Sequence, residues 1–170
     1  MHAHRHLSRI LSTVGFIAML VGIIDPMEGS LIILPGSGLV LLGIFLGQTE
    51  RKVMAFRVCV FILIAFGVGA EFWLSSVGGF GGPGRSMWWG MLILPYLIGW
   101  SMGIWGPDSP RWVLWLGIVV SLYLVAMAIW IKMNPRMPSQ YILISILAAL
   151  GLLTVGGCIC RLRKREPGQQ

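Results

Sequence analysis

The apolar positions of this chain gather into long stretches that polar residues interrupt only briefly. Each stretch is near the length of about 20 residues with which a helix crosses the hydrocarbon core of a membrane. The expected spans cover residues 7–24, 31–47, 53–77, 87–105, 112–132 and 141–160. The connections between them are too short to form a soluble domain. The pattern predicts an all-α integral membrane protein, a bundle of about six transmembrane helices with short loops that forms a single membrane domain over residues 1–170.

The first two stretches carry features that could disqualify them as spans. The first follows a basic amino terminus, MHAHRHLSR, as the apolar part of a signal peptide does. It is long, however, and residues 25–28 (DPME) follow it without a small-residue cleavage pattern, so a retained span is expected. The second contains Pro35, Gly36 and Gly38, which predict an early break in the helix. Irregular backbone at that depth must be buried in protein or line a water-filled cavity.

The distribution of Lys and Arg predicts the orientation of the spans. With both termini inside, the cytoplasmic segments hold nine of these residues and the outer segments hold three. The inner set is Arg5, Arg9, Arg51, Lys52, Arg111, Arg161, Arg163, Lys164 and Arg165, and the outer set is Arg85, Lys132 and Arg136. The bias favours two cytoplasmic termini, an even number of crossings and a basic cytoplasmic tail over 161–170. The expected location is the cell membrane, which in a bacterium is the cytoplasmic membrane.

Composition agrees with this picture and narrows the partners. A mean hydropathy of +0.84, with 56% hydrophobic and 11% charged residues, is typical of a membrane protein. The net charge of +7 does not predict nucleic-acid binding, because the basic residues lie at segment ends and form no continuous stripe with aromatic residues. The lipid bilayer is the expected partner. Cys59, Cys158 and Cys160 are too few for a framework of several disulfides.

Two charged residues, Arg57 and Glu71, lie clearly inside the third span. A charge at mid-helix costs about 2.5–3.5 kcal/mol on insertion, so each is a candidate functional residue. Arg57 lies about 6 Å from the inner end and can extend to the interface. Glu71 lies about 9 Å below the outer end. It is either a proton- or cation-binding carboxylate, or a carboxylate bonded to a neighbouring helix or to interfacial water.

The outer loops hold a second group of candidates, Asp25, Glu28 and Arg85. Arg85 ends the glycine-rich sequence GGFGGPGR, which is either a flexible hairpin loop or an outward-facing binding loop. In the second case Arg85 would meet Asp25, Glu28 or an anionic ligand. Residues 79–84 also match G-x-G-x-x-G, but the dinucleotide fingerprint needs a strand before it, and here a membrane helix precedes it.

No metal or cofactor is expected. His2, His4 and His6 alternate at the amino terminus, where exposed histidines on a tail usually hold nothing specific. The spans contain no histidine, which disfavours a histidine-ligated haem. The cysteines have no recognised ligand spacing.

Small residues four positions apart predict close contacts between helices. Gly43 pairs in this way with Gly47, and Gly99 with Gly103. Gly67 lies one turn from Glu71 and would let another helix approach there. These glycines serve packing within one bundle or association between subunits, and a six-helix chain must first pack against itself.

The sequence therefore favours a non-enzymatic protein. The spans offer no histidine, no Ser/His pair and no cluster of basic residues that would support known membrane catalysis. The first hypothesis is an accessory or structural subunit, or assembly partner, with other membrane subunits as partners. The alternative is a small transporter or channel that uses the broken second helix and Glu71.

Overall fold

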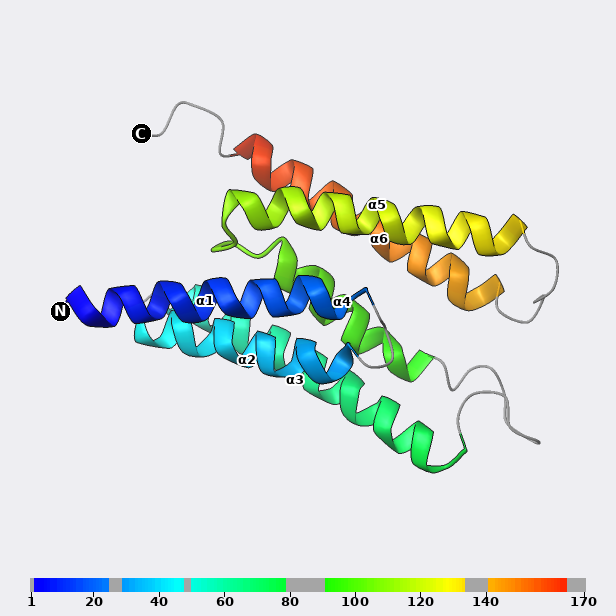
Figure 1. Ribbon diagram of the computed structural model, residues 1–170, viewed down its shortest axis with the longest axis horizontal. Helices are drawn as coiled ribbons and strands as arrows, with labels where there is room; N and C mark the ends of the chain where they lie inside the picture. Colours follow the sequence, from blue (N-terminus) through cyan, green and yellow to red (C-terminus); the bar gives the residue numbers. More distant parts are fainter. Residues whose placement is uncertain (1, 25–28, 48–49, 79–90, 134–140, 165–170) are drawn as a thin grey trace. The chain divides into compact units, whose positions relative to one another are not determined.

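A computed structural model describes residues 2–24, 29–47, 50–78, 91–133 and 141–164. These residues form six helices and no strand (Figure 1), so the all-α prediction is confirmed. The helices are α1 (His2–Gly22), α2 (Ser30–Leu46), α3 (Arg51–Ser76), α4 (Leu94–Ile104), α5 (Arg111–Met133) and α6 (Tyr141–Lys164). Contacts divide the chain into two compact units, here called unit 1 (Met1–Gly103) and unit 2 (Ile104–Gln170). The single membrane domain stays a prediction.

Several helices begin or end away from the expected limits. The basic amino terminus is part of α1, which begins at His2, and α6 continues to Lys164, into the predicted tail. The helix α4 begins only at Leu94, after a 3₁₀ turn at residues 91–93. Pro95 explains this start, because a proline in the first turn of a helix lacks only an N–H that would have no partner within the helix.

The predicted break in the second span is wrong. Pro35 lies inside α2, which continues without interruption from Ser30 to Leu46. The N–H that Pro35 lacks would have bonded to a carbonyl of the first turn. Two residues after Pro35, the Ser37 hydroxyl donates a hydrogen bond of 2.8 Å to the Leu34 carbonyl. That bond is an additional one, because the carbonyl that loses its partner to Pro35 belongs to Leu31.

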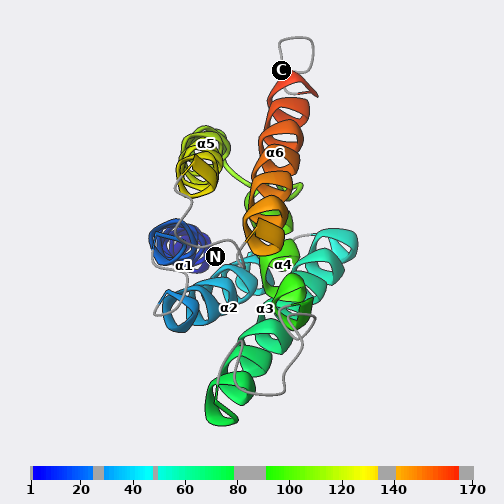
Figure 2. The same ribbon diagram turned by 90° about the vertical axis from the view of Figure 1, so that its right-hand side faces the viewer.

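The helices α1 and α2 pack side by side through small residues that repeat every seven positions (Figures 1 and 2). A Cβ added to Gly15 would lie 2.5 Å from the Gly36 carbonyl oxygen. At one end of the pair, the Ser8 hydroxyl donates a hydrogen bond of 2.6 Å to the Gly43 carbonyl. The repeat is Ser8, Gly15 and Gly22 on the first side and Gly29, Gly36 and Gly43 on the second. The order of these contacts makes the pair antiparallel, and the small residues let the two backbones approach closely along its length.

The helix α3 turns one stripe of residues, spaced by three or four positions, toward the interior of unit 1. The buried members of this interior stripe are Arg57, Val60, Ile64, Gly67, Val68 and Leu74. The stripe packs against α4, where a Cβ added to Gly99 would lie 2.9 Å from Cγ1 of Ile64. Gly67 contacts Tyr96 and Gly103 contacts Val60, so α3 and α4 are antiparallel.

In unit 2, α5 and α6 pack against each other through small residues as well. A Cβ added to Gly151 would lie 3.1 Å from the Ser121 carbonyl oxygen, and one added to Gly117 would lie 3.4 Å from the sulfur of Cys158. The Trp105 ring covers Gly157, 2.9 Å from the position of an added Cβ. Close backbone contact is therefore a property of both units.

Two helices of the described residues are long and apolar enough to cross a membrane. They are Arg51–Ser76 and Arg111–Trp130. Only 28% of each apolar window is buried inside the protein. The shorter apolar helices are His6–Gly22, Ser30–Leu46 and Met91–Ile104.

Candidate functional site

Arg57 lies inside unit 1 and does not extend to the interface as its position in the span suggests. Its side chain is 2% exposed, and its Nη1 donates a hydrogen bond of 2.7 Å to the Gly103 carbonyl. Its guanidinium carbon lies 5.0 Å from the ring centroid of Phe16 on α1 and 5.8 Å from that of Phe56. These four residues are here called the Arg57 cluster. The two rings provide cation–π contacts that partly replace the hydration of the cation.

The Arg57 cluster stabilises the carboxyl-terminal end of α4. Gly103 is the penultimate residue of α4, and the last carbonyls of a helix have no partner within it. The negative end of the helix dipole lies there as well, so Arg57 supplies both a donor and a favourable charge. Nearby, the Trp100 indole N–H donates a hydrogen bond of 2.8 Å to the Met19 carbonyl on α1. Together these contacts tie α1, α3 and α4 into one structure.

Glu71 continues the interior stripe of α3 toward its other end, about 21 Å along the helix from Arg57. Its carboxylate accepts a hydrogen bond from the side chain of Ser30, the first residue of α2. Ser30 is 2% exposed, and Glu71 is half-buried. A bond to a neighbouring helix is thus present, as one of the sequence alternatives supposed.

A third side chain belongs to the surroundings of Glu71. Tyr96 of α4 is 1% exposed and lies within electrostatic reach of the Glu71 carboxylate. Its hydroxyl is buried and has no hydrogen-bond partner among the residues that the structure describes. Glu71, Ser30 and Tyr96 are here called the Glu71 site. The sequence did not indicate Ser30 or Tyr96, because hydropathy says nothing about which helices surround a given position.

The predicted packing glycines all face neighbouring helices of unit 1. Gly43 contacts Ser8 and Ser12 of α1, and a Cβ on Gly47 would lie 2.8 Å from the Ser8 hydroxyl oxygen. Gly67 contacts the backbone of Tyr96, Gly99 packs on α3, and a Cβ on Gly103 would lie 2.6 Å from the methyl carbon of Met19. Sequence reasoning missed Gly15, Gly22 and Gly36. Their spacing of seven was the signal that could have found them.

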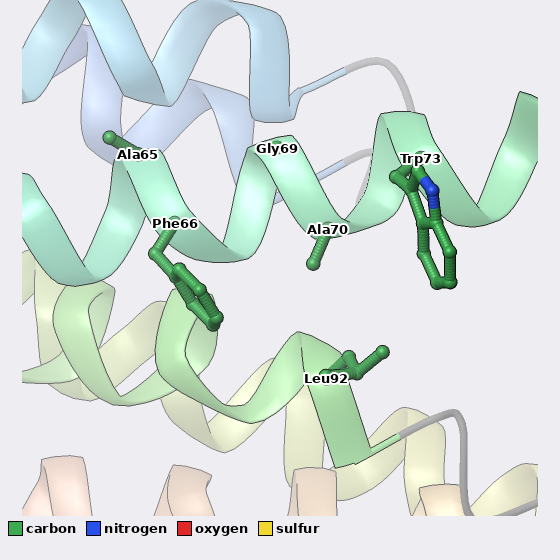
Figure 3. Close-up of a pocket in the computed structure, with 6 residues that line it drawn as sticks. All are labelled: Ala65, Phe66, Gly69, Ala70, Trp73 and Leu92. Carbon is green, nitrogen blue, oxygen red and sulfur yellow. The ribbon is translucent and has the colours of Figure 1, made fainter.

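An apolar groove of about 540 Å³ lies beside α3, and none of its lining residues belongs to the interior stripe. Figure 3 shows Phe66, Ala70 and Trp73 pointing from α3 across this groove toward Leu92. Ala65 and Gly69 complete its lining. The groove can accept an apolar chain, but none of its lining residues has a polar side chain that could do chemistry.

The remaining candidates add nothing to these two clusters. Asp25, Glu28 and Arg85 lie outside the described residues, so the outer binding loop stays a prediction. Within the described ranges, no three His, Cys, Asp or Glu residues come together to hold a metal. Cys158 is buried, whereas Cys59 and Cys160 are exposed.

Comparison with known proteins finds no matching protein-family model, no similar curated protein and no similar solved structure.

Proposed function

We propose that this chain is a six-span membrane protein that acts as a non-catalytic accessory or structural subunit. The observation that supports this role is the use of polar groups inside unit 1. Three interior side chains donate hydrogen bonds to backbone carbonyls of other helices: Ser8 to Gly43, Arg57 to Gly103, and Trp100 to Met19. Bonds of this kind hold helices in fixed positions, and they leave these donors occupied instead of directed at a substrate.

The proposed topology has both termini in the cytoplasm of a cell membrane. The helices α3 and α5 have the length to cross the bilayer, and the bias of Lys and Arg sets their direction. The helix α2 has 17 residues and is about 25 Å long. That is shorter than an average hydrocarbon core, and local thinning of the bilayer accommodates such a difference at modest cost.

Labelling of cysteines at the two ends of α3 tests this topology. Glu50 immediately precedes α3, Ser76 is its last residue, and both are exposed. In a chain with the native cysteines replaced, we expect Ser76→Cys to react with a membrane-impermeant maleimide on intact cells. We expect Glu50→Cys to react only after the cells are permeabilised. Labelling of both positions from outside, or the reverse pattern, would contradict the proposed crossing of α3.

The subunit role leaves the outer apolar faces for contact with partners. The predicted packing glycines are in contact within unit 1, so a partner helix would meet large exposed side chains instead. On α5 these include Trp115, Val119 and Leu122, which are 61%, 59% and 51% exposed. Lipid covers such a face in a free protein, and another membrane subunit replaces the lipid in a complex.

Native mass spectrometry after mild extraction from the chain's own membrane tests the role. We expect recovery in a larger complex of fixed stoichiometry. The matched control is the same preparation in a harsher detergent, which should release the chain as a monomer. Recovery as a free monomer or a homo-oligomer under mild conditions would reject the subunit role.

The transporter or channel alternative loses one of its two supports. It relied on a broken second helix, and α2 is continuous through Pro35. Its other support, Glu71, does not depend on the course of α2.

A further inference from the structure

The Glu71 site takes its oxygen-bearing side chains from three helices of unit 1. Gly67 lies one turn before Glu71 and contacts the backbone of Tyr96, so α3 and α4 touch at this level. A helical side chain leans toward the amino-terminal end of its own helix. Because α3 and α4 are antiparallel, Glu71 and Tyr96 lean toward each other. Ser30 reaches Glu71 from the first turn of α2.

The buried Tyr96 hydroxyl of this site has no hydrogen-bond partner among the described residues. A buried hydroxyl without a hydrogen-bond partner costs free energy, and neither lipid nor the described protein groups relieve that cost here. The Glu71 carboxylate has two oxygens and several lone pairs, of which one accepts the bond from Ser30. The Tyr96 hydroxyl oxygen and the Glu71 carboxylate can therefore both bind a ligand that lies between them.

The described cations of unit 1 do not fill that place. Arg9, Arg51 and Lys52 lie near the opposite ends of their helices, and Arg57 is about 21 Å away along α3. The first turn of α2 supplies the positive end of a helix dipole beside Glu71. That dipole interacts favourably with a carboxylate at this position.

We propose that Glu71, Ser30 and Tyr96 bind a monovalent metal cation of the sodium type. All the ligand atoms are oxygens, which are the donors that hard cations prefer. A single carboxylate balances a single positive charge. A divalent ion would leave a net charge in a poorly solvated interior, which is costly. The cation lies between the Glu71 carboxylate and the Tyr96 oxygen, and it relieves the unpartnered hydroxyl.

Thermal unfolding of the purified full chain tests the proposal. Unfolding in detergent micelles is followed by tryptophan fluorescence while sodium chloride replaces N-methylglucamine chloride at constant ionic strength. A ligand that binds only the folded state raises the unfolding temperature in a saturable way. We expect a rise of several degrees with sodium, and no rise with the organic cation, which is too large for the site.

Four variants locate the effect. Glu71→Gln is expected to abolish the rise, and Tyr96→Phe to weaken the apparent affinity about tenfold through loss of one ligand. The matched controls are Glu50→Gln and Tyr123→Phe, which change an exposed carboxylate and an exposed tyrosine outside the site. Both controls should keep the wild-type response. The same rise in Glu71→Gln as in the wild type would overturn the proposal.

A direct measurement keeps the test valid if Glu71→Gln does not fold. Radioactive sodium should bind the wild-type chain at one site, and unlabelled sodium should displace it. The absence of both binding and a rise in unfolding temperature would overturn the proposal. In that event, equal losses of stability in Arg85→Gln and Glu71→Gln would identify Arg85 as the partner of the carboxylate. The site stands or falls independently of whether the chain is recovered in a complex.

Discussion

Alanine in place of Gly15 is expected to lower the free energy of unfolding by about 1–3 kcal/mol, because it forces a methyl group into a closed contact. The added Cβ would lie 2.5 Å from the Gly36 carbonyl oxygen and 2.8 Å from the Val40 backbone nitrogen. Neither atom belongs to a flexible side chain, so the helices α1 and α2 must move apart. The free energy can be measured by titrating the protein in mixed micelles with dodecyl sulfate.

Gly69→Ala is the matched control for this substitution. Gly69 lies inside α3, and no atom lies within 4 Å of an added Cβ there. Alanine favours a helix over glycine by up to about 1 kcal/mol, so this variant should be slightly more stable than the wild type. The two Gly→Ala changes are thus expected to have opposite signs. Equal effects at both positions would show that the close α1–α2 contact does not exist in the folded protein.

Methionine in place of Arg57 is expected to lower the free energy of unfolding by about 2–3 kcal/mol. The substitution keeps much of the side-chain volume but removes the donor to the Gly103 carbonyl, which is then left without that bond. It also removes the cation–π contacts with Phe16 and Phe56. The free energy of unfolding of Arg57→Lys should lie between those of the wild type and Arg57→Met, because lysine keeps the charge but lacks the planar fork of donors.

Arg51→Met provides the comparison within the same helix. Arg51 is exposed at the start of α3, so its loss should change the free energy of unfolding by less than about 0.5 kcal/mol. The same titration measures all these variants. Arg57→Met with unchanged stability would mean that Arg57 reaches the interface and does not hold the end of α4.

The helices themselves could be predicted from the sequence, and their partners could not. Apolar runs of membrane-spanning length indicate helices because every backbone group in lipid must be satisfied within its own segment. That requirement also explains the error at Pro35. A proline removes one backbone hydrogen bond from a helix, and α2 continues through Pro35 with the loss of that one bond.

The Arg57 cluster and the Glu71 site show why only the charged member of each could be predicted from the sequence. Arg57 and Glu71 stood out because ionisable residues are rare in apolar segments. The partner of Arg57 is the Gly103 carbonyl, 46 positions away, and no side-chain pattern marks a backbone acceptor. Ser30 and Tyr96 are ordinary residues of membrane segments, and only the packing of α2 and α4 on α3 brings them to Glu71.

The opposite charges at the two ends of the interior stripe have a consequence for an energised membrane. In the proposed orientation Arg57 lies toward the negative cytoplasmic side and Glu71 toward the positive outer side. A membrane potential acts on each elementary charge with about 2.3 kcal/mol per 100 mV for a full crossing. With the two charges about 21 Å apart along the helix, the field across the bilayer would favour this direction of α3 whenever the Glu71 carboxylate is ionised and holds no cation. The potential would oppose an inverted α3, in which both charges would stand on the unfavourable side.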